Sequence, residues 1–337
     1  MNLFEEIEEK TTVYTQNPAS GPHVAVIGGG TGLSTVLRGL KLFTHNLTAI
    51  VTVADNGGSS GMLREDLGIL PPGDIRNCIL ALADPEPLME KLLNYRFTEG
   101  RLKGQNFGNL LIAAMNAISD NFYDAVRNVS KVLAVKGRVL PVSLEDLQII
   151  AHLSDGTIIE GESEIGNRPP PFDHQIVKIS MRPQNAKALP EAVKALLSAD
   201  IIVIGPGSLY TSIIPNLLFP EISQAIRASK ACRIYVCNIM TQPAETMGYM
   251  ASQHLQAILK HMGAESADGW IDYCIVNNAW VDHDLLTRYR LESATPVYLD
   301  HSSIEQLGTF VIDAPLAFIR EGVIRHDPLL LARLILY

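Results

Sequence analysis

Cysteine is scarce in this 337-residue chain, and its few cysteines lack the spacing of a metal or redox site. Cys78, Cys232, Cys237 and Cys274 lie in or beside apolar runs, and none of them forms a C-x-x-C pair. Buried thiols in such surroundings behave as small apolar side chains. We therefore expect structural thiols, with no disulfide framework and no zinc site.

Positive charge is also in short supply. The chain has 27 Lys and Arg against 36 Asp and Glu, a formal net charge of −9. Proteins that bind nucleic acid over a broad surface need a basic face, so we expect no nucleic-acid partner. An anionic ligand would have to be held by local hydrogen-bond donors, because the overall field of the protein repels it.

Long apolar runs and a basic leader are missing as well. No apolar run reaches the roughly 18 residues that a membrane span needs. The first twenty residues carry Glu5, Glu6, Glu8 and Glu9 where a signal peptide would be basic. We expect no membrane insertion and a cytoplasmic location.

Short apolar runs that end at polar loops alternate with segments of helical periodicity. The expected strands are 24–27, 47–53, 201–204, 234–237 and 271–276, with shorter ones near 296–299 and 309–312. This alternation predicts an α/β fold, a Rossmann-like doubly wound sheet that is mostly parallel. The spacing also predicts an inserted helical block over 74–134. Asp155-Gly156 predicts the turn of a small antiparallel hairpin subdomain within about 138–180.

The two ends of the chain have distinct characters. Residues 1–22 are acidic and then polar, which predicts a peripheral arm before a single nucleotide-binding domain over 23–337. The last expected helix, 328–336, is rich in leucine and suits either the core or a homodimer interface. Asp327 with Pro328 is a typical helix start, and His326 just before it is a weaker candidate for contact with a ligand.

Glycine-rich loops follow several of the expected strands. The first, Gly28-Gly29-Gly30-Thr31-Gly32, precedes a helix, where backbone N–H groups and the helix dipole favour a phosphate. It lacks the third glycine of a dinucleotide fingerprint, because Leu33 stands there, and it has no Walker A lysine. A tight turn with no ligand is the alternative.

Further polar loops have the same character. Asp55 follows the second strand at the spacing of a ribose-binding acid, and the run to Gly61 offers hydroxyls to a second phosphate or a metal. Asp74 suits an N-cap, with Arg76 and Asn77 one turn further. Loops at 104–109, 205–212 and 238–245 complete the set.

Together these loops resemble the gluconeogenesis factor family (YvcK type), which is related to the 2-phospho-L-lactate transferases (CofD type). The resemblance runs in order from about 23 to 336 and rests on five segments: 28–32, 54–64, 71–77, 205–218 and 241–243. It implies a Rossmann-like nucleotide-binding protein. Members of the first branch bind UDP-sugars and support cell shape and envelope synthesis on gluconeogenic carbon sources. Members of the second transfer a phospholactyl group from a guanosine diphospho donor, with a divalent metal such as magnesium.

Three functions stay open on the sequence: a UDP-sugar-binding regulatory protein, which we favour, a transferase, and a binder of NAD. The first needs no cofactor. In the transferase, Asp55 and Asp74 would be catalytic and share magnesium, although Asn56 stands where many relatives have a second Asp. The expected ligand-binding residues are Gly29, Gly30, Thr31, Gly32, Asp55, Asn56, Ser59, Ser60, Arg64, Asp74, Arg76, Asn77, Asn109, Gly205, Gly207, Ser208, Thr211 and Asn238.

Overall fold

A parallel sheet forms the centre of the molecule. The computed structural model describes residues 3–84, 86–281, 283–320 and 322–337. Seven strands lie in the order β10-β9-β8-β7-β1-β2-β3, and every neighbouring pair is parallel. They are β1 (Val24–Gly28), β2 (Leu47–Val51), β3 (Arg138–Pro141), β7 (Ile201–Ile204), β8 (Cys232–Val236), β9 (Tyr273–Asn277) and β10 (Phe310–Ala314). The predicted α/β fold is confirmed.

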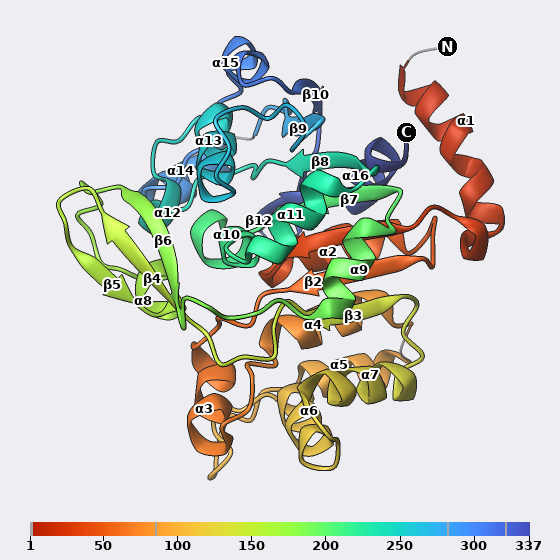
Figure 1. Cartoon of the computed structure of the whole chain (residues 1–337), viewed down its shortest axis with the longest axis vertical. Helices are drawn as coiled ribbons and strands as arrows, with labels where there is room; N and C mark the ends of the chain where they lie inside the picture. The colour runs from red at the N-terminus through yellow and green to blue at the C-terminus, as the bar shows by residue number, and fades with distance from the viewer. Residues whose placement is uncertain (1–2, 85, 282, 321) are drawn as a thin grey trace.

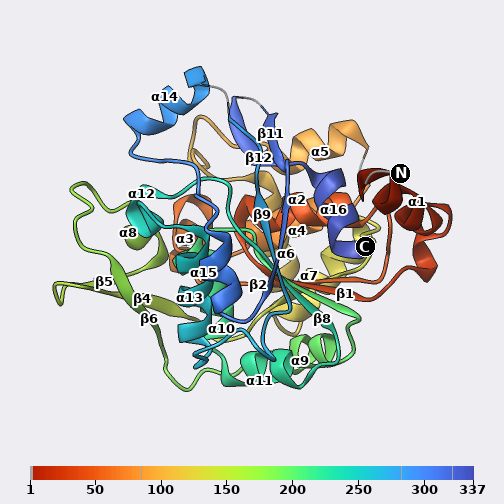
Figure 2. The same ribbon diagram turned by 90° about the horizontal axis from the view of Figure 1, so that it is seen from above.

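Helices cover both faces of this sheet, as the continuous apolar runs of its strands require. Every residue of β1 and β2 is buried. Figure 2 shows one layer on each side of the strands. The first layer holds α2 (Gly30–Leu40), α4 (Gly73–Leu82) and α16 (Pro328–Leu336), and the second holds α9 (Pro190–Leu197), α10 (Ile214–Leu217) and α11 (Pro220–Ala228).

The strand order places a topological switch point beside β1. From β1 the chain continues to β2 and β3 on one side, and it later forms β7 on the other side and proceeds to β10. The connections that leave β1 and β7 therefore run in opposite directions. In open α/β sheets the crevice between such connections, at the carboxyl ends of the strands, is where ligands bind.

Two smaller units flank the sheet (Figure 1). The helical block contains α3 (Gly58–Leu67), α5 (Pro87–Asn94), α6 (Phe107–Ala117) and α7 (Phe122–Val132). A three-stranded antiparallel sheet, β5-β4-β6, contains β4 (Gln148–Leu153), β5 (Ile158–Glu160) and β6 (Ile176–Arg182), with α8 (Glu162–Gly166) after β5. The antiparallel unit thus begins at Gln148 instead of near 138, because β3 pairs in parallel with β2.

The remaining elements lie mostly in the second half of the chain. Residues 296–299 form no strand, only isolated bridges at Pro296 and Tyr298. The hairpin of β11 (Ala317–Arg320) and β12 (Val323–His326) lies beyond β10. The other helices are α12 (Pro243–Thr246), α13 (Ala251–His261), α14 (His283–Leu291) and α15 (His301–Gln306), with a 3-10 turn at Pro18–Ser20 and a π-helical turn at Leu209–Ile213.

The N-terminal segment is a helix, α1 (Leu3–Gln16), which packs against α16; residues 1–2 of the expected arm lie outside the described residues. Ile7 and Thr11 are buried, and Glu8 pairs with Arg333 at 2.7 Å. The apolar face of α16 is therefore covered by α2 and α1 of the same chain, so the leucines of this helix no longer argue for a homodimer.

None of the helices in the described ranges is long and apolar enough for a membrane crossing.

The crossing of α2 and α16 depends on Gly39. A Cβ added at this position would overlap the carbonyl oxygen of Pro328 and lie 3.0 Å from the Cβ of Ala332. We expect Gly39→Ala to lower the free energy of unfolding by about 1–3 kcal/mol, as overpacking does elsewhere. Urea denaturation measures this loss. Gly166→Ala is the control, since its Cβ would meet nothing nearer than 4.0 Å, and an equal loss in both variants would contradict the explanation.

Candidate functional site

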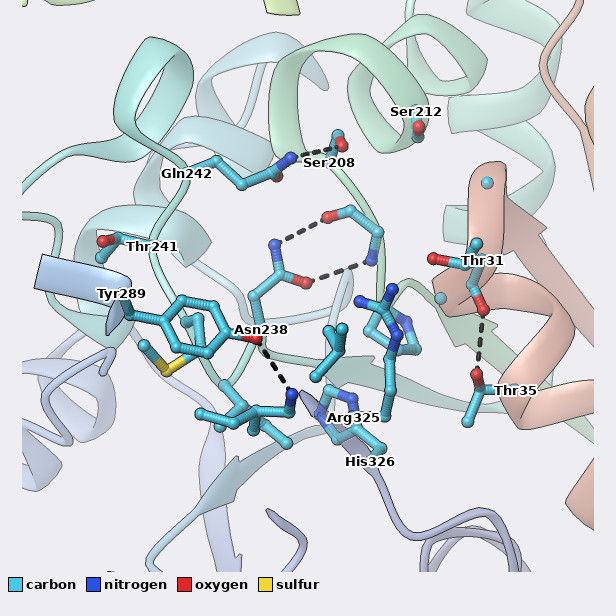
Figure 3. Close-up of a pocket in the computed structure, with 18 of the residues that line it drawn as sticks. Thr31, Thr35, Ser208, Ser212, Asn238, Thr241, Gln242, Tyr289, Arg325 and His326 are labelled. Atoms are coloured by element: carbon cyan, nitrogen blue, oxygen red, sulfur yellow. Dashed lines mark hydrogen bonds between the residues drawn. The ribbon is translucent and has the colours of Figure 1, made fainter. Parts of the chain in front are cut away.

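A cavity of about 330 Å³ opens at the switch point between β1 and β7. We call it the central cavity. The loops after β1, β7 and β8 form its floor and walls, and residues of α14 and β12 complete the lining (Figure 3). Its lining residues are Gly29, Gly30, Thr31, Gly32, Thr35, Pro206, Gly207, Ser208, Ser212, Asn238, Ile239, Met240, Thr241, Gln242, Arg288, Tyr289, Glu292, Val323, Ile324, Arg325 and His326.

The β1 loop brings the N-terminus of α2 into this cavity. Gly29 is the N-cap residue and has no side chain of its own to cap the helix, while the buried Asp74 carboxyl accepts a hydrogen bond from the Gly30 N–H. The first backbone N–H groups of a helix have no partner within the helix and attract anions. Gly32 lets the β7 loop come close, because a Cβ there would overlap the carbonyl oxygen of Pro206. The two glycine-rich loops thus form one wall.

The β7 loop is held by side chains from the loop after β8. Asn238 accepts a hydrogen bond from the Gly207 N–H at 3.1 Å through Oδ1 and donates to the Gly207 carbonyl at 2.7 Å through Nδ2. Gln242 Nε2 donates to Ser208 Oγ at 2.8 Å. These contacts (Figure 3) fix the conformation of the loop before any ligand binds.

A buried carboxylate supports the next turn, the π-helical segment Leu209–Ile213. Glu245 accepts hydrogen bonds from the backbone N–H of Tyr210 at 2.8 Å and from Thr211 Oγ1 at 2.9 Å. Only 3% of Glu245 is exposed, and burial raises the pKa of its carboxyl. The carboxylate positions the turn that carries Ser212.

Two arginines in the lining of the central cavity supply positive charge. Arg288 and Arg325 both line it, and Figure 3 shows the Arg325 side chain extending from β12 into the space. Tyr289 joins α14 to β12, because its hydroxyl accepts a hydrogen bond from the Ile324 N–H at 2.9 Å. Burial lowers the pKa of His326 to about 4, so this lining imidazole is neutral at pH 7.

A second cavity of about 260 Å³ adjoins the first. We call it the acidic cavity, since Asp55, Asp74 and Glu162 line it together with Thr52 and Thr211. It shares four lining residues with the central cavity: Gly30, Thr31, Ser208 and Ser212. A Cβ on Gly29 would lie 2.7 Å from Asp74 Oδ2, so the Asp74 carboxylate packs directly against the β1 loop. A phosphate on this loop therefore fits on the central side.

Burial and neighbouring negative charge raise the pKa of two acids of this cavity. Burial and then the charge of Asp55 raise the pKa of Asp74 to about 6. Burial, followed by the charges of Asp55 and Asp74, raises the pKa of Glu162 to about 8. Nevertheless, no three acidic, histidine or cysteine side chains among the described residues have an arrangement that could hold a metal ion.

This environment predicts a pH-dependent effect of Glu162→Gln on stability. Between its ordinary pKa of 4.5 and the folded value of about 8, Glu162 is ionised in the unfolded chain but protonated in the folded one. The stability of the wild type therefore falls as pH rises through this window. The surrounding acids, Asp55, Asp74, Glu164 and Glu245, all act in the same direction. We expect the variant to gain unfolding free energy relative to wild type from about pH 5 to about pH 8, as urea titrations would measure. A difference that does not change with pH would contradict this.

Comparisons with known proteins agree with the fold and the loops. The model of the family described as 2-phospho-L-lactate transferase CofD matches residues 24–317. The gluconeogenesis factor of Bacillus subtilis is 45% identical over 91% of this chain and 94% of its own. A relative from Thermoanaerobacterium thermosulfurigenes is 55% identical over 94% of this chain and 97% of its own. The chain belongs to the gluconeogenesis factor family. The structure of a Bacillus halodurans member of the UPF0052 family, 45% identical, superposes with a TM-score of 0.89 over 93% of this chain and 99% of that one.

Within this gluconeogenesis factor fold, the expected site residues separate into two groups. One group lines the two cavities: Gly29, Gly30, Thr31, Gly32, Asp55, Asp74, Gly207, Ser208, Thr211 and Asn238. The other lines neither of them: Asn56, Ser59, Ser60, Arg64, Arg76, Asn77, Asn109 and Gly205. The residues of the second group make contacts within the protein.

The run after Asp55 is a helix start and not an open loop. Ser59 and Ser60 belong to α3 and are buried. Ser59 Oγ donates to Gln105 at 2.8 Å, and Ser60 Oγ accepts from the Gly73 N–H at 3.1 Å. Their hydroxyls therefore join α3 to the loop before α6 and to the start of α4 instead of facing a phosphate.

The arginines of this region are engaged as well. Arg64 pairs with Asp146 at 2.6 Å. Arg76 donates to Asn109 at 3.0 Å and to Asn77 at 2.8 Å, which accounts for all three of these residues. Gly205 forms the turn behind the cavity with φ +76. Likewise Asp74 is not an N-cap: Pro72 holds that position, and Asp74 lies in the first turn of α4.

Asn56 has a role that a second aspartate could not fill. Its Oδ1 accepts from the Ser163 N–H at 2.7 Å, while its Nδ2 donates to Glu164 at 2.8 Å. A carboxylate could not make the second bond with an ionised Glu164. Asn56 thereby attaches α8 to the β2 loop and places Glu162 opposite Asp55.

Several lining residues were absent from the sequence-based list. Ser212 belongs to the segment 205–218 and Gln242 to the segment 241–243, both of which carry the family resemblance. A prediction that took every polar residue of these two segments would have included them. Arg288, Arg325 and Glu162 had no local signal, because they follow no glycine-rich strand end. Only the packing of α14, β12 and α8 brings them to the site.

Proposed function

We propose that this member of the gluconeogenesis factor family is a cytoplasmic regulatory protein that binds a nucleotide-sugar, specifically a UDP-sugar, in the central cavity. Occupancy of the site would report the supply of envelope precursors, and the protein would support cell shape when cells grow on gluconeogenic carbon. Binding would need no metal. The proposal combines the resemblance of the loops with the geometry of the cavity.

One observation carries the proposal: the N-terminus of a helix and two arginines meet in a single cavity at the switch point. Gly30 and Thr31 at the start of α2 line this cavity together with Arg288 and Arg325. Helix N-termini and guanidinium groups are the groups that bind phosphate in proteins. In a chain of net charge −9 this local arrangement favours a diphosphate.

Calorimetric titration with UDP-N-acetylglucosamine, GDP and NAD, each with and without magnesium, tests the binding. We expect binding of the UDP-sugar alone, unchanged by magnesium. GDP binding that requires magnesium would reject the proposal in favour of the phospholactyl transferase. Binding of NAD alone would reject it in favour of a dinucleotide protein.

A deletion strain tests the regulatory part. We expect misshapen cells on a gluconeogenic carbon source and normal cells on glucose. The wild-type gene should restore the shape, whereas a gene whose product does not bind the UDP-sugar should fail. Full rescue by the non-binding variant would separate the cellular role from the nucleotide-sugar.

A further inference from the structure

The two cavities are joined end to end, and the residues they share mark where they meet. Gly30, Thr31, Ser208 and Ser212 line both. Arg288 and Arg325 line the central cavity, with Arg325 beside the shared residue Thr31 in Figure 3, and carboxyl groups line the acidic cavity. A ligand that fills both must therefore have an anionic part near the junction and a part without negative charge beyond it.

Ser212 supplies an independent sign of a ligand at this junction. Only 7% of the residue is exposed, and its hydroxyl makes no hydrogen bond to any of the described residues. Ser212 Oγ lies 3.7 Å from the position that a Cβ on Gly30 would take, at the start of α2. Figure 3 places it on the same side of the central cavity as Thr31. The rest of the residue is enclosed while the hydroxyl is open to the cavities, so it can hydrogen-bond to a ligand that enters them.

The chemistry of the acidic cavity selects what lies beyond the junction. Carboxylates accept hydrogen bonds from hydroxyl groups and repel phosphates. Glu162 makes no hydrogen bond within the described part of the chain, and its side chain faces Asp55 and Asp74 across the space. Both hydrogen-bonding capacity and room are therefore available for a group rich in hydroxyls.

We infer that the acidic cavity holds the sugar of the nucleotide-sugar, with Asp55 and Glu162 bound to its hydroxyls and Ser212 at the diphosphate. This inference rests on the proposed function and assigns a direction to the ligand. The base and ribose occupy the central cavity toward Gln242 and Tyr289, and the diphosphate lies at the shared residues. The linear order of a nucleotide-sugar matches the order of the two cavities.

Paired titrations with UDP and UDP-N-acetylglucosamine test this assignment. Wild type should bind the UDP-sugar about tenfold or more tightly than UDP without magnesium, as two hydrogen bonds between these acids and the sugar hydroxyls would give. Glu162→Ala and Asp55→Asn should remove most of this preference and leave the affinity for UDP within about twofold. Ser212→Ala should weaken both ligands. Glu164→Gln is the matched control: it removes a charge from the same helix and keeps an acceptor for Asn56.

The outcomes separate the inference from the proposed function. Equal affinity of wild type for UDP and the UDP-sugar would overturn the sugar subsite while leaving nucleotide-sugar binding intact. Equal weakening of both ligands by Glu162→Ala would do the same. A preference that appears only with magnesium would make these acids metal ligands and also overturn it. If neither uridine nucleotide binds, the proposed function fails and the subsite with it.

Discussion

Replacing Arg325 with alanine is expected to weaken the binding of a UDP-sugar by about 10- to 100-fold, the range for losing hydrogen bonds between charged groups. Arg325 is an exposed residue of β12, and its side chain extends into the central cavity (Figure 3). In a protein of net charge −9, few other cations near the site can replace it. Calorimetry at two salt concentrations would measure the loss, which should shrink at high salt because screening already weakens the wild type.

Stability and location provide the controls for this variant. Arg325 makes no buried contact that folding needs, so the urea midpoint should be unchanged. Arg127→Ala is the matched substitution, since Arg127 is an exposed arginine on α7 paired with Asp124 and far from the cavity. Unchanged affinity in Arg325→Ala, or an equal loss in Arg127→Ala, would show that the phosphates lie elsewhere.

Glu245→Ala is expected to lower the free energy of unfolding by about 3 kcal/mol, because it leaves buried donors without an acceptor. The backbone N–H of Tyr210 and the hydroxyl of Thr211 both lose their partner, and both residues are buried. The segment Leu209–Ile213 would also lose the contact that fixes it, so UDP-sugar binding should weaken even where the protein remains folded. Urea denaturation and calorimetry measure the two effects.

Glu245→Gln distinguishes lost hydrogen bonds from lost volume. Glutamine keeps one acceptor oxygen for Thr211 but presents an NH2 donor to the Tyr210 N–H, so its loss should be intermediate. Glu65→Ala, at an exposed position on α3, should change stability by less than about 0.5 kcal/mol. A Glu245→Ala protein as stable as wild type would contradict the role of this carboxylate.

Local patterns predicted the elements that the chain forms by itself. The glycine run after Ile27 predicted the loop that opens α2, and Asp155-Gly156 predicted the hairpin between β4 and β5. The leucine-rich helix was placed correctly at 328–336, where Asp327 accepts from the N–H groups of Leu329 and Leu330 at 2.9 Å. Such features depend on backbone conformation and neighbouring side chains, which a single sequence displays.

The same patterns were less informative about which way polar side chains face. The sequence around Ser59 and Ser60 is typical of phosphate ligands, yet in the structure their hydroxyls bond to Gln105 and to the Gly73 N–H. The leucine-rich sequence of α16 is compatible with the core or with a homodimer interface. Only the packing of α1 against α16 in the structure shows that the same chain covers this helix. When a helix is buried by a segment far away in the chain, its own sequence does not show this, because the burial depends on which helix surfaces pack together in the folded protein.

The sequence by itself determined the class of fold, the presence of glycine-rich loops after β1 and β7, and the family. The tertiary structure alone decided that these two loops share one cavity, because β1 and β7 pair in parallel across more than half of the chain. It also decided that Arg325 and Glu162 line two adjoining cavities. The strand order and the positions of β12 and α8 result from packing between segments that are far apart in the chain. Many arrangements of these segments would bury nearly the same apolar surface, and the close fit of the side chains selects one of them.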